Sequence, residues 1–338
     1  MPEPSSESWK KMVLRSMQPP AWLADDAPDS DIVISSRFRT ARNLKGHRYP
    51  HHADPTELIE IANKVKDSTK NLPLSPINTI TEAERDFLLG ARLISHDFQH
   101  SKPGRMVLLD EPRLLSIMVN EEDHLRIQAV SAGWSIRQAV REGEKITASL
   151  TKNLEFQSAP EFGFLTASPT NLGGGNRRSA LFHLAGLSTQ GRLNRLIKSL
   201  HHIGITTRGL FGESSRGIAS FVQVSATKNT ETDFIGACNH LIQEERLARQ
   251  EAAKSQTLEK AQSAVEFAIM SNQVSMRDAL LVLGYVRWAA AIELPEFPLT
   301  PRQVDSWVTE MEVFGTQSAT AAARQRADYL RSKLENLS

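Results

Sequence analysis

Strand-like segments occur along roughly the first two thirds of the chain and stop near Glu231. Up to that point, short apolar runs alternate with amphipathic helical patterns. Beyond it, long charged helical patterns run over residues 233–271, 275–292 and 301–337, and no strand pattern recurs. A change of texture of this kind predicts an α+β region followed by an all-helical region.

The first region carries the signals of a mainly antiparallel sheet. Apolar runs at residues 106–109 and 114–119 are separated by a short turn-forming sequence, which is typical of a hairpin. Three segments have helical periodicity: one that begins at Pro55, one over residues 135–150 and one that ends at Gly204. We therefore expect helices to flank the sheet. Other strands are predicted over residues 32–35, 127–130, 163–167, 205–211 and 221–224. We therefore predict an α+β fold with a mainly antiparallel sheet flanked by helices, followed by a helical C-terminal domain.

The length of 338 residues suits about two domains. We predict a lead segment over residues 1–21, a sheet-bearing domain over residues 22–230 and a helical domain over residues 231–338. The patterned helices of the last part have more apolar positions than a lone tail could bury. We therefore expect this part to mediate homodimerisation.

Composition excludes several classes of protein. Lysine and arginine total 40 against 39 acids, and a net charge of +1 argues against a broad nucleic-acid binder. The single cysteine, Cys238, excludes an intramolecular disulfide and a metal site built on several thiolates. No segment reaches the roughly 20 apolar residues of a membrane helix, and residues 1–31 lack the apolar core of a signal peptide. We predict a cytoplasmic protein without a membrane or nucleic-acid partner.

A run of acids follows an apolar strand pattern, in the sequence Asn120-Glu121-Glu122-Asp123-His124-Leu125-Arg126. Three consecutive carboxylates repel one another, and on a solvated surface turn this costs little. The alternative interpretation is a carboxylate cluster at a strand end that holds a cationic substrate. Arg126 would then face a separate anion.

A glycine-rich loop covers residues 168–178, with Pro169, Asn171 and three successive glycines before Arg177 and Arg178. Glycines let the backbone approach a ligand closely, and guanidinium groups pair well with phosphate oxygens. The loop lacks the lysine and hydroxyl ending of a P-loop and the spacing of a dinucleotide-binding loop. It is either an anion-binding loop or a mobile surface loop.

Two further segments place arginines at strand ends. Arg37 and Arg39 stand two residues apart, so in extended chain they face the same side, and Phe38 faces the core. Arg208 and Glu213 lie around the end of another predicted strand. Each segment is open to a plain interpretation, as solvated arginines or as an ordinary exit from a strand.

In combination these features resemble the phosphagen kinase superfamily, the ATP:guanidino phosphotransferases, and most closely the bacterial protein-arginine kinases of the McsB family. The resemblance rests on residues 28–44, 120–126, 163–173 and 208–213, which occur in the family's order. It extends over residues 22–226 and continues weakly through the helical tail. It implies that residues 22–230 form a phosphagen-kinase-type catalytic domain.

The resemblance also implies roles for individual residues. Nucleotide phosphates would be bound by Ser36, Arg37, Arg39, Arg126, Arg177 and Arg208, and catalysis would involve Glu122, Glu213, Ser168 and Asn171. ATP and Mg²⁺ are the implied cofactors, with no metal held by protein side chains. Glu122 and Glu213 would hold the substrate guanidinium in line with the terminal phosphate, and one of them would accept its proton.

The implied activity is an ATP-dependent kinase that phosphorylates arginine side chains of proteins and marks them for Clp-type proteolysis. Small-molecule kinases of the superfamily carry an extra N-terminal helical domain, for which the start of the arginine motif at Ser35 leaves no room. A protein-bound arginine needs an open approach, so we expect protein substrates. The resemblance adds a Clp ATPase and an activator protein as partners.

The chain departs from the family pattern at a few positions. Ser168 replaces a usual cysteine beside the guanidinium, and Gly174 and Arg178 replace a threonine and an alanine. Ala322-Ala323 replaces the first charged pair of the family's phosphoarginine-sensing motif. These departures leave two alternatives open, a catalytically weakened nucleotide-binding adaptor and a kinase of a free guanidino metabolite.

Overall fold

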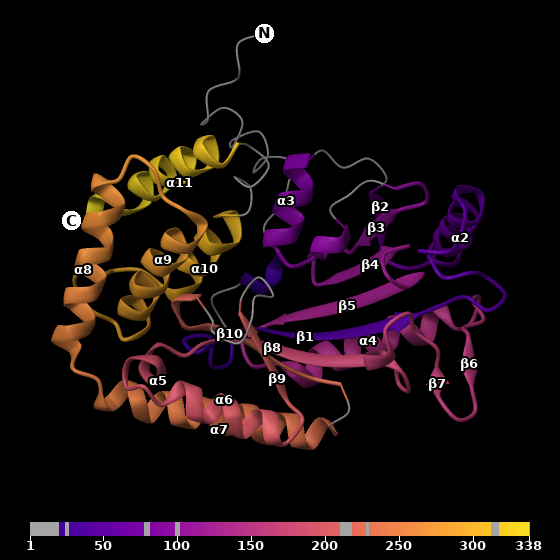
Figure 1. Cartoon of the computed structure of the whole chain (residues 1–338), viewed down its shortest axis with the longest axis horizontal. Coiled ribbons are helices and arrows are strands. Elements are labelled where there is room, and N and C mark those ends of the chain that lie inside the picture. Colours follow the sequence, from indigo (N-terminus) through magenta and orange to yellow (C-terminus); the bar gives the residue numbers. More distant parts are fainter. Residues whose placement is uncertain are drawn as a thin grey trace, which may run out of the picture.

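The computed structural model describes residues 20–23, 27–77, 82–98, 102–209, 218–227, 230–311 and 318–337. Its centre is an eight-stranded sheet with the strand order β2-β3-β4-β5-β1-β8-β10-β9, in which every pair is antiparallel (Figure 1). The strands are β1 (Val33–Arg42), β2 (Ser75–Ile77), β3 (Met106–Leu109), β4 (Leu115–Val119), β5 (Leu125–Ala132), β8 (Asn176–His183), β9 (Thr206–Gly209) and β10 (Phe221–Ala226). A separate hairpin pairs β6 (Ser158–Ala159) with β7 (Gly163–Phe164). The predicted antiparallel α+β fold is confirmed.

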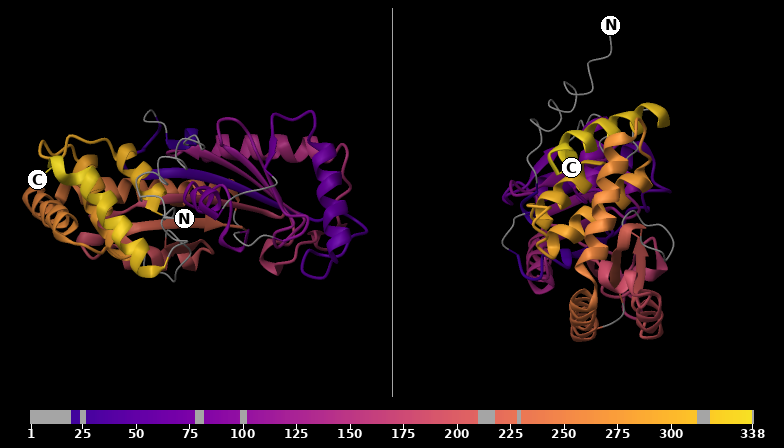
Figure 2. Two further views of the ribbon diagram at one scale, coloured as in Figure 1. Left: turned by 90° about the horizontal axis from the view of Figure 1, so that it is seen from above. Right: turned by 90° about the vertical axis from the view of Figure 1, so that its left-hand side faces the viewer.

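Helices pack beside the sheet, and a helical C-terminal region follows its last strand (Figures 1 and 2). The helices of the sheet region are α2 (Pro55–Ser68), α3 (Glu82–Gly90), α4 (Ile136–Leu150), α5 (Ala185–Thr189) and α6 (Leu193–His202). They are followed by α7 (Glu231–Glu251), α8 (Lys254–Met270), α9 (Met276–Ala291), α10 (Pro301–Glu310) and α11 (Ala319–Leu334). Among the described residues from Glu231 onward every element is helical, as predicted. None of the described helices is long and apolar enough to cross a membrane.

The prediction and the structure differ at several elements. The strand predicted at residues 32–35 extends to Arg42, because β1 pairs with a neighbour along both edges and its arginines face a cavity. β8 was not predicted, because its polar start, Asn176 to Ser179, has the composition of a loop. The helical pattern over residues 233–271 is two helices, with extended backbone at Ala252 and Ala253.

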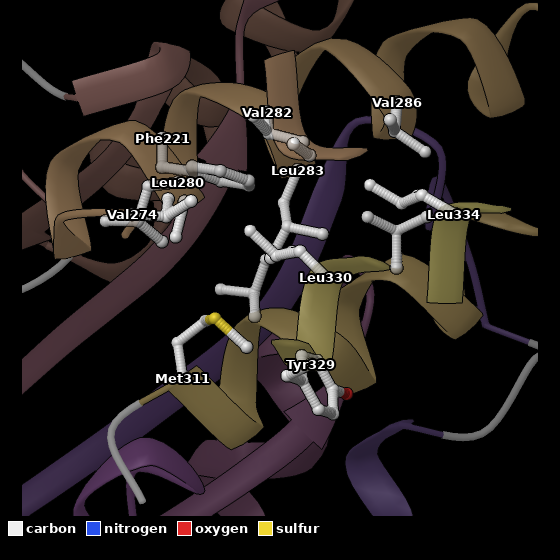
Figure 3. Close-up of a cluster of buried hydrophobic side chains, with 14 of the residues drawn as sticks. Phe221, Val274, Leu280, Val282, Leu283, Val286, Met311, Tyr329, Leu330 and Leu334 are labelled. Carbon is white, nitrogen blue, oxygen red and sulfur yellow. The ribbon is translucent and has the colours of Figure 1, made fainter. Parts of the chain in front are cut away.

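The helical region shares a hydrophobic core with the sheet. In Figure 3 Leu280 of α9 lies beside Phe221 of β10, and Leu283 of α9 faces Leu330 of α11. The same cluster includes buried apolar side chains of β1, β5 and β8, namely Ile34, Val130 and Leu181. The boundary between residues 230 and 231 is a change of secondary structure across which packing is continuous. Division into domains at that point stays a prediction.

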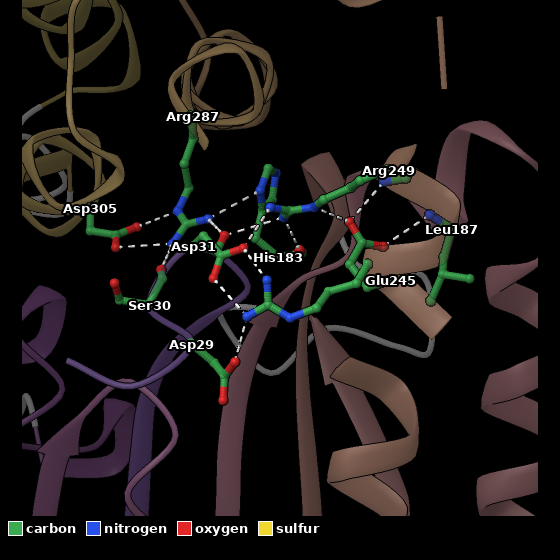
Figure 4. A network of polar contacts seen from close by, with 11 residues as sticks. Asp29, Ser30, Asp31, His183, Leu187, Glu245, Arg249, Arg287 and Asp305 are labelled. Carbon is green, nitrogen blue, oxygen red and sulfur yellow. Dashed lines mark hydrogen bonds and ion pairs between the residues drawn. The ribbon is translucent and has the colours of Figure 1, made fainter. Parts of the chain in front are cut away.

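A buried polar network joins the two regions (Figure 4). Arg287 of α9 is fully buried and donates to both carboxylate oxygens of Asp305 in α10, at 2.7 and 3.2 Å. It also donates to the backbone carbonyls of Ser30 and Asp31, which precede β1. Because α10 also borders the cavity described below, this network positions the helical region against the site.

Replacing Arg287 with methionine should lower the free energy of unfolding by about 3–5 kcal/mol, because it leaves the buried Asp305 carboxylate without its main partner. Denaturant unfolding followed by circular dichroism measures the loss. Combining Arg287→Met with Asp305→Leu should recover part of it, since no charge is then stranded. A loss below about 1 kcal/mol for the single variant, the range of an exposed ion pair, would contradict this assignment.

Candidate active site

A cavity of about 380 Å³ is lined by residues of strands β5, β1, β8 and β9, the last of which is at the edge of the sheet. The predicted site residues that line it are Arg37, Arg39, Glu122, Arg126, Ser168, Asn171, Arg177 and Arg208. They come from four strands and two loops that are far apart in the sequence. The structure therefore brings most of the predicted site residues together.

Strand register explains why the arginines converge. Arg37 and Arg39 alternate with the buried Phe38 along β1, as predicted, and therefore face one side of the sheet. Arg39 lies directly opposite Arg177 of the neighbouring strand β8. Arg208 of β9 lies opposite Gln223 of β10, which lines the same cavity. Same-face side chains on adjacent strands lie close together, so the sheet itself gathers these cations.

The gathered guanidinium groups are poorly neutralised within the described residues. Burial, followed by repulsion from neighbouring arginines, lowers the pKa of Arg37 and Arg39 well below the usual value and that of Arg177 to about 10. A group with a pKa of about 10 is still charged at pH 7. Nε of Arg39 and Nε of Arg177 are buried without a hydrogen-bond partner. Such a cavity is suited to an anion that carries several negative charges.

Contacts with neighbouring side chains hold Arg126 and Arg37 in place. Arg126 pairs with the buried carboxylate of Glu121, which also accepts a hydrogen bond from Ser95. Arg37 donates to Gln223 at 2.7 Å and to Ser179 at 3.3 Å. The side chains are thereby oriented before any ligand arrives, which is the condition for strong electrostatic stabilisation.

The acidic run after β4 is an ordered turn whose residues differ in burial and in hydrogen bonding. Glu121 and Asp123 are buried, so the interpretation as a solvated surface turn is wrong for both of them. Asp123 accepts hydrogen bonds from Asn43 at 2.6 Å and from the backbone N–H of Ala167 at 2.7 Å. The second bond ties the turn to the loop that carries Ser168.

Glu122 is the exposed member of this turn and lines the cavity. No hydrogen bond or ion pair to its carboxylate occurs within the part of the chain that the structure describes. Partial burial, together with the charges of Asp123 and Glu121, raises its pKa above the ordinary value. An unpaired carboxylate with a raised pKa, facing the cavity, is a candidate for binding a cation and accepting a proton.

Ser168 and Asn171 border the same cavity on the short 3-10 turn η3 (Pro169–Asn171) and the residue before it. The Ser168 hydroxyl lies 2.8 Å from that of Thr170, and the Ser168 carbonyl accepts a hydrogen bond from Thr166. The loop is therefore held by internal contacts, which argues against the interpretation as a mobile surface loop.

Two predicted site residues do not belong to this group. Ser36 alternates with the cavity-facing arginines, so its hydroxyl lies on the other side of β1. There it donates to the carbonyl of Gly133 at 2.8 Å and accepts from the backbone N–H of Ser135 at 3.0 Å. The Ser36 hydroxyl therefore contacts the start of α4 and faces away from the cavity, and nucleotide binding by Ser36 stays a prediction. Glu213 lies outside the described residues.

Residues 56–251 match the family described as ATP:guanido phosphotransferase, C-terminal catalytic domain. This stretch is more than half of the chain and includes the acidic turn and most of the arginines. The chain belongs to the ATP:guanido phosphotransferase family. Its similarity extends to bacterial protein-arginine kinases. That of Halothermothrix orenii is 33% identical over 281 residues, which cover 79% of this chain and 80% of the relative. That of Clostridium acetobutylicum is 33% identical over 288 residues, covering 80% and 85%.

Solved structures of other kinases share the fold of this ATP:guanido phosphotransferase. A lombricine kinase aligns with a TM-score of 0.57 and 20% identity, over 73% of this chain and 78% of that one. A duplicated taurocyamine kinase from Schistosoma mansoni, solved with transition-state analogue components, aligns with a TM-score of 0.56 and 19% identity. The alignment covers 71% of this chain and 38% of that longer one. The predicted phosphagen-kinase-type fold and the predicted family are confirmed.

The cavity of this ATP:guanido phosphotransferase includes residues that sequence reasoning missed. Arg92 follows α3 in a left-handed backbone conformation, and burial lowers its pKa to about 10. Arg92 is a single arginine in a predicted helix, so no local sequence pattern identifies it as a cavity residue. Asp305 of α10 also lines the cavity, although it lies 213 residues after Arg92 in the sequence. Only the tertiary fold reveals either position.

Proposed function

We propose that this chain transfers the γ-phosphoryl group of ATP to arginine side chains of proteins. The observation that carries the proposal is that one cavity holds both a cluster of partly buried arginines and the carboxylate of Glu122, which has no ion-pair partner among the described residues. The cations suit a polyphosphate, and the carboxylate suits a guanidinium. The relatives named protein-arginine kinase support a protein-bound acceptor.

In this proposal the phosphates of ATP bind among Arg37, Arg39, Arg126, Arg177 and Arg208. Their guanidinium groups neutralise the negative charge that spreads over the phosphoryl oxygens as the group moves. Among the described residues no set of three or more His, Cys, Asp or Glu side chains is placed to hold a metal ion. Mg²⁺ would accompany the nucleotide and would help to neutralise its phosphates, and the carboxylates that line the cavity and could hold it there include Glu121 and Glu122.

The proposed chemistry needs a base, because an arginine side chain is protonated at neutral pH. Glu122, together with Glu213, would hold the guanidinium so that one of its nitrogens faces the γ-phosphorus. A nitrogen–phosphorus bond forms, the bond from phosphorus to the β–γ bridging oxygen breaks, ADP leaves, and the proton passes to Glu122. Alignment of this kind is worth roughly 7–11 kcal/mol in well-ordered cases.

Ser168 and Asn171 would lie beside the acceptor guanidinium, on the loop tied to the acidic turn through Ala167 and Asp123. A serine hydroxyl offers a hydrogen bond, whereas a cysteine near cations ionises and adds a negative charge. The serine therefore leaves orientation of the guanidinium to the carboxylates.

Replacing Ser168 with cysteine should raise turnover several-fold while the ATP affinity stays within about twofold, because only the acceptor side gains a charge. Initial rates at saturating Mg-ATP with one unfolded acceptor protein measure the change. The gain should disappear at a pH low enough to protonate the new thiol. Flat or reduced turnover in a folded variant would contradict this prediction and would leave two explanations, a loop adapted to the hydroxyl or a catalytically weakened nucleotide-binding adaptor.

We further propose that phosphorylation by this chain marks its targets for a Clp-type protease in the cytoplasm and that an activator protein assists it. Homodimerisation through residues 231–338 belongs to the same proposal, because exposed apolar side chains such as Phe267 and Met270 lie on α8. Family membership and the relatives' names support the kinase activity, and these finer statements extend it.

A direct test of the proposed function follows ADP release in the presence of Mg-ATP. An unfolded acceptor protein should stimulate it, and the same protein with every arginine replaced by lysine should not. Equal stimulation by both acceptors would reject arginine as the phosphoryl acceptor.

A further inference from the structure

A platform beside the cavity is formed by the β6–β7 hairpin, residues 158–164, and by the loop of residues 168–175. The two segments are bonded together: the backbone N–H of Phe164 donates to the carbonyl of Gly173 at 2.8 Å, and Gly163 forms a β-bridge with Gly173. The approach is so close that a Cβ on Gly163 would lie 2.6 Å from the Gly173 carbonyl oxygen. The platform is therefore one unit, and its loop borders the cavity through Ser168 and Asn171.

Arg42 holds this platform against the end of β1. Its guanidinium lies 3.7 Å from the centre of the Phe164 ring and donates to the carbonyl of Gly174 at 2.9 Å. Arg42 is buried and Phe164 is half-buried, and burial lowers the pKa of Arg42 to about 10, so its side chain is still charged at neutral pH. A surface fixed in this way is preorganised, which lowers the entropy cost of binding a partner.

Two large apolar side chains on the platform face solvent. Phe162, at the tip of the hairpin, is 59% exposed, and Leu172, next to the cavity-lining Asn171, is 39% exposed. The other exposed large apolar residues within the described ranges lie on other segments, namely Ile59, Ile203, Leu247, Phe267 and Met270. A single exposed apolar side chain is ordinary, but two on one rigid unit beside a cavity mark a contact surface.

The position of the platform points to its partner. The side chain of an arginine is only a few bonds long. If its guanidinium reaches Glu122, the main chain of the acceptor polypeptide must therefore lie against the rim of the cavity. The loop of the platform lines the cavity at Ser168, Thr170 and Asn171, and Figure 1 shows the β6–β7 hairpin, which is bonded to this loop, projecting from the body of the protein. The exposed Glu161 beside Phe162 adds a negative charge that favours a basic segment.

We propose that this platform is the docking surface for the acceptor polypeptide, with Phe162 and Leu172 contacting a large apolar side chain close to the target arginine. The inference rests on the proposed function, since it assumes a protein-bound acceptor. Folded proteins bury their large apolar side chains, so the platform favours arginines in unfolded segments. Substrate choice would then depend on exposure of the neighbours of the arginine as well as on the arginine.

The test compares two acceptors and two pairs of substitutions. The acceptors are an unfolded arginine-containing protein and N-acetylarginine amide, which has a guanidinium but no flanking chain. The platform variant combines Phe162→Ser with Leu172→Ser. The matched control combines Ile203→Ser with Leu247→Ser, which removes two similarly exposed apolar side chains from the end of α6 and from α7.

We expect the platform variant to lower the ratio of kcat/KM for the unfolded protein to that for N-acetylarginine amide by about tenfold, or about 1.4 kcal/mol. The loss should lie mainly in the KM for the protein, and the control should keep the wild-type ratio. An unchanged ratio in the platform variant, or an equal fall in the control, would overturn the docking surface and leave the proposed function intact. If the wild-type enzyme labels no protein arginine, the proposed function fails and this inference fails with it.

Discussion

Replacing Glu122 with glutamine should lower phosphoryl transfer to arginine by about 10²–10⁴-fold, the range for loss of a general base. Glutamine keeps the size of the side chain but cannot accept the proton or attract the guanidinium. ATP binding should stay within about twofold of wild type, because the phosphate site is built from arginines on the strands. Single-turnover rates, together with nucleotide binding by calorimetry, measure both quantities.

The pH dependence gives a second readout of the same residue. Glu122 works as a carboxylate, so activity should fall as the pH falls through its pKa. Burial and the neighbouring acids raise that pKa, so the fall should begin at a higher pH than for an ordinary glutamate. A raised pKa in the folded state also means that ionisation of Glu122 opposes folding, so Glu122→Gln should be no less stable than wild type at neutral pH.

The matched control is Glu111→Gln, which changes an exposed carboxylate in the turn between β3 and β4. It should keep full activity and the wild-type pH profile. Retention of most activity in Glu122→Gln, at the same nucleotide affinity, would remove Glu122 from the role of base.

Replacing Arg208 with alanine should lower kcat/KM by about 10²–10³-fold, the effect of removing one preorganised group that stabilises developing charge. Arg208 lines the cavity, and within the described residues no ion pair engages it, so its guanidinium is available to the phosphates. ATP affinity should fall about tenfold at the same time, since the contact exists before the reaction as well as during it.

Arg126→Ala tests the same site from the other side and should behave similarly, with an added cost. Arg126 is the ion-pair partner of the buried Glu121, so its loss also leaves that carboxylate uncompensated and should lower stability. The control is Arg141→Ala, on the exposed face of α4, which should change neither quantity. Unchanged nucleotide affinity in both cavity variants would exclude these arginines from the phosphate site.

Local sequence patterns were sufficient to predict the orientation of side chains that alternate along a single strand. The alternation of Arg37, Phe38 and Arg39 predicts two cations on one face and a buried ring on the other, and the structure has this arrangement. The hairpin of β3 and β4 was equally readable, because apolar runs flank a turn-forming sequence. In both cases the information lies within a few consecutive residues.

The alternation of side chains along β1 also shows that the resemblance implied a nucleotide contact for a residue whose hydroxyl faces away from the cavity. Ser36 belongs to the same motif as the arginines, but it occupies the opposite face of β1 and contacts Gly133 and Ser135. A motif can contain both residues that stabilise the fold and residues that contact a ligand. The period of the strand, applied strictly, separates the two kinds.

Long-range pairing accounts for what the sequence did not reveal. β8 begins with four polar residues and becomes a strand because it pairs with both β1 and β10. Arg92 and Asp305 enter the cavity only through packing of α3 and α10 beside the sheet. The buried pair of Arg287 and Asp305 likewise joins helices whose polar faces would be expected in solvent.

The measurement that tests the central claim most directly is incubation of the full chain with Mg-ATP labelled in the γ-phosphoryl group and an unfolded, arginine-rich protein. A phosphoryl group on an arginine nitrogen is lost in acid, whereas phosphate on serine or threonine survives it. The account predicts acid-labile label that mass spectrometry places on arginine residues and that Glu122→Gln abolishes. Acid-stable label, label confined to free guanidino compounds, or no label at all would contradict it.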